Sequence, residues 1–91
     1  MTGGPAGELF LDATALEPPE PFQQALSILQ GLKHGHYLRM LHRRLPYPLF
    51  DTCDQLGIGH RYIAGPHETW IILFWRADDP TVASHCRQID A

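Results

Sequence analysis

Cysteine is scarce in this sequence, with only Cys53 and Cys86 among 91 residues. The two thiols can pair only if the fold brings them together. The first ten residues, MTGGPAGELF, lack the basic segment and apolar core of a signal peptide. We therefore expect two free thiols in a reducing cytoplasm.

Long hydrophobic runs and an excess of positive charge are also missing. The longest apolar run, from Trp70 to Trp75, is far shorter than the roughly 20 residues of a membrane-spanning helix. The net charge is −3, and there is no glycine-rich phosphate loop or RNA-stacking signature. These absences predict no membrane partner and no nucleic-acid partner.

The composition is that of a small folded domain. Apolar residues make up 44% of the chain and charged residues 19%, which argues against disorder. A chain of 91 residues is too short for two separate cores. One layer of helices on one sheet is the largest architecture it can bury.

Hydrophobic periodicity divides the chain into six elements. Alternation predicts strands over 8–12, 36–42, 58–64 and 69–77. Apolar residues spaced by three and four predict a helix that starts near Pro19 and a second helix within 45–57. We expect a flexible segment at 1–7, a single domain at 8–77 and a polar C-terminal tail at 78–91.

This order, β-α-β-α-β-β, predicts an α+β two-layer sandwich. Right-handed crossovers place both helices on one face of a four-stranded mixed sheet. The first three strands run parallel, and the fourth returns antiparallel through the turn at 65–68.

Three loops then meet at one rim of the sheet. They follow the first three strands and contain the segments LEPPEP, HRRLPYP and AGPHE. The amino termini of both helices point to the same rim, where open α/β sheets bind ligands. We expect a ligand or partner site formed by Glu17, Pro18, Pro19, Glu20, Pro21, His42, Arg43, Arg44, Tyr47 and His67.

The motif at the first helix resembles that of the TusA/SirA-like proteins, whose signature is a cysteine followed by Pro-x-Pro. Residues 19–21, PEP, match, but Pro18 stands where those proteins have the cysteine. The chain is more similar to a cysteine-free branch of unknown function, which has a Pro-Pro-Glu-Pro motif and a segment like LRMLHRRLPYPLF (38–50). Some members of that branch are fused to hemerythrin-like or other redox-associated modules. The resemblance covers about residues 8–77.

The missing cysteine bears on function. TusA-like carriers hold sulfur as a persulfide, which needs a thiolate at the start of the helix. Proline has no nucleophile, Cys53 falls on an apolar helical stripe, and Cys86 lies in the tail. The resemblance therefore implies a binding or regulatory module that is not an enzyme and uses no cofactor. A sulfur-transfer or redox-associated accessory protein is the alternative.

A metal- or anion-binding sensor is a further alternative. His42, His67 and Arg43 belong to the rim, whereas His34, His36 and His60 belong to the opposite edge, and no HExxH or paired CxxC motif is present. In the simpler interpretation, Glu20 complements the helix dipole and the arginines are solvated. His42 and His67 are thus weak metal candidates only.

The last strand is apolar on both faces. A sheet covered on one side alternates apolar with polar residues, so an exposed apolar face here predicts a homodimer or a protein partner. Alternatively, the aromatic side chains lie flat on the sheet or the tail covers them. The expected interface residues are Phe10, Tyr37, Leu41, Trp70, Ile72, Phe74 and Trp75.

Overall fold

The computed structural model of the protein describes residues 7–90. Most of the segment expected to be flexible, residues 1–6, lies outside the described residues. The elements in chain order are β1 (Gly7–Asp12), α1 (Glu20–Gln30), β2 (His36–His42), α2 (Tyr47–Leu56), β3 (Ile58–Ala64), β4 (Trp70–Arg76) and α3 (Pro80–Gln88).

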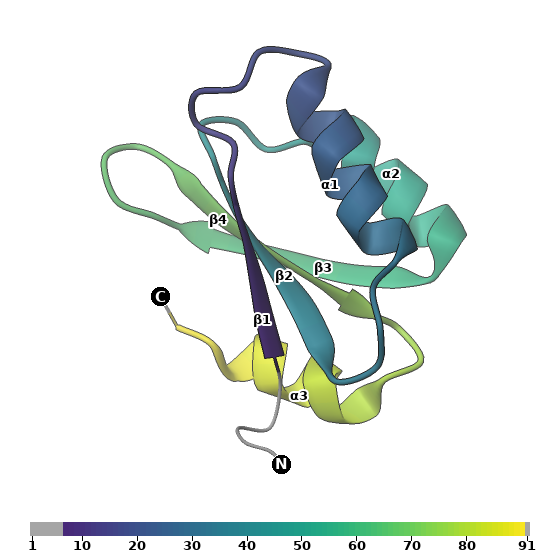
Figure 1. The fold of residues 1–91 in the computed structure, drawn as a ribbon. Helices are drawn as coiled ribbons and strands as arrows, with labels where there is room; N and C mark the ends of the chain where they lie inside the picture. Colours follow the sequence, from purple (N-terminus) through teal and green to yellow (C-terminus); the bar gives the residue numbers. More distant parts are fainter. Residues whose placement is uncertain (1–6, 91) are drawn as a thin grey trace.

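The four strands form one mixed sheet in the order β1-β2-β4-β3 (Figure 1). β1 and β2 are parallel, and β4 runs antiparallel to both of its neighbours, β2 and β3. The first three strands therefore share one direction, and the fourth lies between the second and third. This confirms the predicted α+β architecture, with the predicted strands within two residues of their observed bounds.

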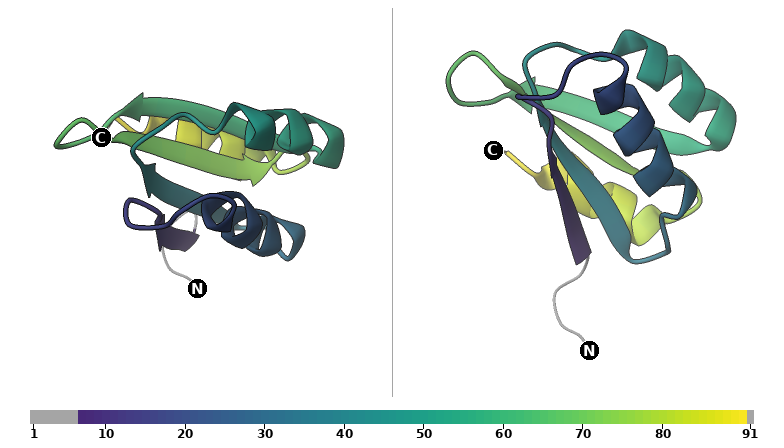
Figure 2. Two further views of the ribbon diagram at one scale, coloured as in Figure 1. Left: turned by 90° about the horizontal axis from the view of Figure 1, so that it is seen from above. Right: turned by 45° about the horizontal axis from the view of Figure 1, so that its top comes forward.

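α1 and α2 cover one face of the sheet (Figures 1 and 2). α1 buries Pro21, Ala25 and Leu29, which recur every four residues and so lie on one side of the helix. α2 ends at Gly57, whose φ of 72° is a left-handed conformation that favours glycine. Among the described residues, no helix is both long enough and apolar enough to cross a membrane.

A tight hairpin turn joins β3 to β4. His67 and Glu68 have positive φ angles of 52° and 60°, and the Thr69 N–H donates to the Pro66 carbonyl at 3.1 Å. These features define a type I′ turn, which Asn-Gly usually occupies. Two residues with Cβ atoms here cost on the order of 1 kcal/mol each.

The C-terminal segment corrects the expected tail. Residues 80–88 form α3, which lies on the face of the sheet opposite α1 and α2 (Figure 2). The Asp79 carboxylate accepts from the Val82 N–H at 3.3 Å and from the Gly35 N–H at 2.8 Å. The domain therefore extends beyond the predicted boundary at 77, because a short apolar stripe packs a mostly polar helix on the sheet.

α3 also changes the predicted interface. Ile72 and Phe74 are fully buried under α1 and α2, and Tyr37 and Trp75 are each 4% exposed in a second core beneath α3. Trp70 is half-buried against the first core and Leu41 against the second. The prediction that these residues form an exposed apolar face is wrong, since β4 is central and helices cover both of its faces.

Phe10 is the exception among the expected interface residues. It is 57% exposed on the edge strand β1. The Trp75 indole packs against Gly59, where an added Cβ would lie 2.5 Å from its Nε1 atom. β4 is apolar on both faces because it contributes to two cores. Of the predicted interface residues, Phe10 on β1 is the large aromatic residue that is exposed.

Candidate functional site

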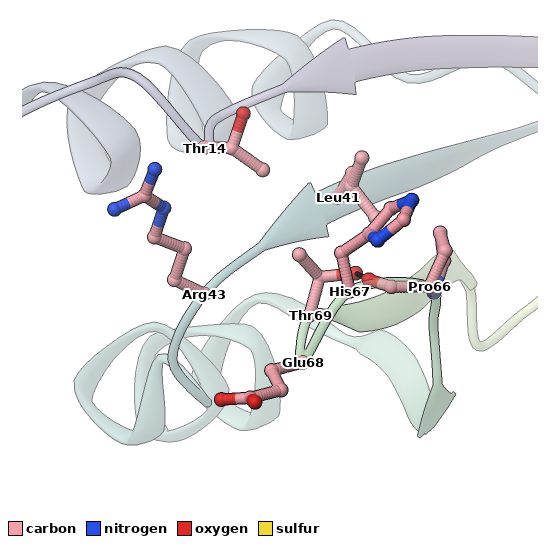
Figure 3. A pocket seen from close by; sticks show the side chains of 7 residues that line it. All are labelled: Thr14, Leu41, Arg43, Pro66, His67, Glu68 and Thr69. Carbon is pink, nitrogen blue, oxygen red and sulfur yellow. Dashed lines mark hydrogen bonds between the residues drawn. The ribbon is translucent and has the colours of Figure 1, made fainter.

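The three predicted loops meet at one rim of the sheet, where they enclose two separate depressions. The first, which we call the proline groove, has a volume of about 300 Å³ and is lined by Pro18, Pro19, Pro21, Phe22, His42, Arg44, Leu45, Pro46, Pro48 and Leu49. The second, which we call the hairpin pocket, has a volume of about 560 Å³ and is lined by Thr14, Leu41, Arg43, Pro66, His67, Glu68 and Thr69 (Figure 3).

Strand alternation explains why there are two sites. Successive side chains of a strand point to opposite faces. At the end of β2, His42 and Arg44 therefore line the groove on the side of α1 and α2, whereas Arg43 lines the pocket on the other side. The rim that the sequence predicts as one site is divided by the sheet, and His42 and His67 are in different depressions.

The proline groove is an apolar channel between the starts of two helices. Pro18 is part of its wall. Proline rings fix φ, so this wall is stiff. Phe22, Leu45 and Leu49 supply the rest of the apolar lining, and the polar groups come from His42 and Arg44. The groove suits an apolar group with a negative charge beside it.

His42 is held as a neutral ring. Its partial burial and the nearby Arg44 charge lower its pKa below the usual value. Its Nδ1 atom accepts a hydrogen bond from the Arg43 N–H at 2.9 Å, so the proton of the neutral ring is on Nε2. Metal binding through Nε2 would move that proton to Nδ1 and break this hydrogen bond. The geometry disfavours His42 as a ligand.

The helix starts offer few N–H groups to an anion. In the first turn of α1, Glu20 donates its N–H to the Glu17 carbonyl at 2.8 Å, and Pro21 has none. In α2, the Leu49 N–H donates to the Pro46 carbonyl at 2.9 Å, and Pro48 has none. The alternative of an anion-binding site needs free donors at these positions. The prolines and local turns remove most of them.

The hairpin pocket has groups of both charge signs. Arg43 reaches it from the end of β2 and Glu68 from the hairpin (Figure 3), and neither takes part in an ion pair within the described part of the chain. The hydroxyl groups of Thr14 and Thr69 already donate to nearby acceptors. Arg43 and His67 thus line the same cavity, and an acidic residue, Glu68, lines it as well.

The other predicted rim residues are outside both depressions. Glu17, Glu20 and Tyr47 are exposed, and the Tyr47 ring contacts Phe50 edge-on with centroids 5.9 Å apart. Within residues 7–90 there is no group of three side chains suited to hold a metal ion. Sequence reasoning did not place several of the lining residues at the rim. Two signals could have identified them, namely the alternation of side chains along β2 for Leu41 and, for the others, a position in or beside one of the three loops. These residues are Thr14, Phe22, Leu41, Leu45, Pro46, Pro48, Leu49, Pro66, Glu68 and Thr69.

Both thiols are remote from the rim and from each other. Cys53 and Cys86 are free and fully buried, and they belong to cores on opposite faces of the sheet. Burial, with a smaller effect of Asp54, raises the pKa of Cys53 to about 12. Burial also raises the pKa of Cys86 to about 11. Neither is an accessible thiolate, which is the nucleophilic form of cysteine.

Comparison with known proteins identifies the chain at the level of a family. No curated protein and no solved structure matches it. The sequence profile of a family described as "Uncharacterized conserved protein (DUF2249)" matches residues 10–76. That span runs from β1 to the end of β4, includes the residues of the proline groove and the hairpin pocket, and leaves out α3. The chain therefore belongs to this uncharacterised family, DUF2249.

Proposed function

We propose that the protein is a non-enzymatic binding module whose proline groove holds an apolar segment of a partner protein. The observation that carries the proposal is the groove itself, a stiff apolar channel of about 300 Å³ with Arg44 beside it. A surface that is already rigid loses little conformational entropy on binding. Arg44 favours a partner segment with an acidic residue next to its apolar anchor.

The missing nucleophile supports binding over catalysis. Pro18 is in the groove wall, and both cysteines are buried with raised pKa values. The resemblance to the TusA/SirA-like proteins suggests a molecule that has kept their rim as a contact surface and lost persulfide chemistry. A role as an accessory to a redox or sulfur-handling protein is compatible with this mode of action.

A charge-reversal pair tests the groove. Arg44→Glu places a negative charge at the groove, whereas Lys33→Glu makes the same change in net charge at an exposed position before β2, at the other end of the strand. We expect the wild type and Lys33→Glu to capture the same partner from cells that contain the protein. Arg44→Glu should retain about tenfold less, which corresponds to roughly 1.4 kcal/mol.

Quantitative mass spectrometry of the three captures provides the measurement, and circular dichroism checks that each variant is folded. Equal recovery of every protein by the wild type, Arg44→Glu and Lys33→Glu would contradict the proposal. So would loss of a partner in Lys33→Glu with retention in Arg44→Glu, because that result places the contact at the other end of the molecule.

A further inference from the structure

β1 is an edge strand of the sheet formed by the described residues. It is the first strand in the sheet order, and among residues 7–90 its only neighbour is β2 (Figure 2). The Gly7 N–H donates to the Gly35 carbonyl at 2.6 Å, and the Ala13 N–H donates to the Leu41 carbonyl at 2.8 Å. Because main-chain groups alternate in direction along a strand, the N–H and C=O groups of Glu8, Phe10 and Asp12 point away from β2.

This edge lacks three of the devices that protect natural edge strands against pairing, which are proline, lysine and a bulge. Its charged residues, Glu8 and Asp12, are near the two ends of the strand and leave its centre apolar. The β1 sequence, GELFLD, has no proline or lysine, and its register with β2 is continuous. Phe10 is 57% exposed on one face of the strand and Leu9 is 39% exposed on the other. Exposed apolar groups therefore flank the free hydrogen-bonding edge on both sides.

The opposite edge of the sheet is less apolar. β3 presents Tyr62, which is 45% exposed but has a polar hydroxyl group. On the same strand, His60 bonds Asp54 and Arg61 bonds the end of α3. β1 therefore exposes two large apolar side chains, Leu9 and Phe10, whereas β3 exposes one, Tyr62.

We propose that β1 pairs with β1 of a second copy of the protein, antiparallel about a two-fold axis at Phe10. The three outward-facing residues are spaced symmetrically about Phe10, so this register uses all of them. Each of these residues donates its N–H to the other copy and accepts a hydrogen bond at its C=O, so the three residues form six hydrogen bonds across the axis. The two sheets become one sheet of eight strands, twice the four in one copy.

Side chains fit this register at its centre. The two Phe10 rings lie opposite each other on the α3 face, and Leu9 faces Leu11 of the second copy on the face covered by α1 and α2. Aromatic and aliphatic cross-strand pairs of this kind stabilise antiparallel sheets. The pairing is isologous, which is the commonest arrangement of protein dimers. This inference does not depend on the proline groove or on its partner.

Charge at the two ends of the pairing gives the dimer a recognisable salt dependence. Glu8 lies opposite Asp12 of the second copy at each end. The Glu8 carboxylate already accepts hydrogen bonds from Tyr37 and Arg39, each at 2.8 Å, which offsets part of its charge. The remaining like-charge repulsion is screened by salt. We therefore expect the dimer to become tighter as the salt concentration rises.

Substitutions at Phe10 test the pairing without removing an internal backbone hydrogen bond. The Phe10 N–H points away from β2, so Phe10→Pro removes no backbone hydrogen bond within the chain, whereas it removes two of the six bonds between the copies and the contact of the two rings. Phe10→Lys places two like charges opposite each other at the axis and avoids any backbone strain from proline. Tyr62→Lys makes a comparable change on the other edge strand and is the matched control.

Sedimentation equilibrium over a wide concentration range gives the mass of each protein. We expect the wild type and Tyr62→Lys to reach twice the 10.3 kDa mass of the chain, and both Phe10 variants to remain at the single-chain mass. A wild type that is monomeric at every concentration would overturn the proposal. A dimer that survives Phe10→Lys but is lost in Tyr62→Lys would assign the interface to β3 instead.

Hydrogen exchange identifies the paired strand directly. In the wild-type dimer the amides of Glu8, Phe10 and Asp12 should exchange slowly, and in the Phe10→Lys monomer they should exchange rapidly. A wild-type dimer in which these three amides exchange rapidly would show that another surface joins the copies, which also overturns the proposal. Pairing of β1 with an extended segment of a different protein would protect these amides only in a mixed complex.

Discussion

At the residue scale, the function of the rim depends on which face of the sheet each side chain occupies. His42 and Arg44 line the proline groove, and their neighbour Arg43 lines the hairpin pocket. The sequence places all three at the same rim, because His42 is the last residue of β2 and Arg43 and Arg44 directly follow it. The sequence does not show that side chains continue to alternate between the two faces of the sheet beyond His42, because the residues after the predicted strand have the pattern of a loop. This alternation is what places Arg43 in a different depression from His42 and Arg44.

The two cysteines provide a test at this scale. We predict that Cys53 and Cys86 do not react with an alkylating reagent in the native protein, because both are fully buried with raised pKa values. Native labelling should be slower than labelling in denaturant by a factor of roughly 10³ or more, which is the opening equilibrium of a stable domain. Mass spectrometry of the labelled protein gives both rates.

An introduced thiol controls for reagent access. Ser84 is exposed on α3, in the same helix as Cys86. The new thiol of Ser84→Cys should be labelled at once in the native state. Labelling of native Cys53 at a similar rate would show an accessible nucleophile and would restore the sulfur-carrier interpretation.

At the element scale, α3 is the part of the fold that sequence patterns predict least well. Its apolar stripe consists of Val82, Ala83 and Cys86 only, and the surrounding residues are polar. Its position depends on groups far away in the sequence, because Asp79 binds Gly35 and Arg61 binds carbonyls at the end of the helix. The start of α3 does have local signals, with Asp79 as its N-cap and Pro80 as its first residue, but no glycine follows its last residue. α1 and α2 have both a proline near the start and a glycine directly after the last residue, and these two signals together predict both helices.

We predict that Arg61 anchors the end of α3. Its Nη1 atom donates to the carbonyl groups of Cys86, Arg87 and Ile89 at 2.9, 2.9 and 2.6 Å. Arg61→Met keeps much of the side-chain length and removes these bonds, so it should lower the free energy of unfolding by about 1–3 kcal/mol. Urea denaturation gives this value, and hydrogen exchange should show the loss of protection concentrated in α3.

Arg43→Met is the matched control, because Arg43 is exposed and takes part in no ion pair among residues 7–90. It should change stability by less than about 0.5 kcal/mol. If both variants unfold at the same urea concentration and α3 exchanges equally in each, Arg61 does not hold the helix.

At the scale of the whole molecule, the order and direction of the strands place the groove. Right-handed crossovers bring the β1–α1 and β2–α2 loops together, so the topology predicted from periodicity also predicts that Pro18 and Arg44 share a site. The covered back of the sheet was not predictable in the same way. An apolar strand such as β4 indicates burial on two faces, but not whether a helix of the same chain or a second molecule provides the cover.

In-cell photocrosslinking tests the central claim, partner binding in the proline groove, most directly. A benzophenone amino acid placed at Pro48 lies in the groove and leaves Arg44 in place, whereas the same amino acid at Lys33 lies outside it. We predict a discrete crosslinked product between the Pro48 position and one partner protein, with none from Lys33. No product from Pro48, or the same products from both positions, would contradict the account.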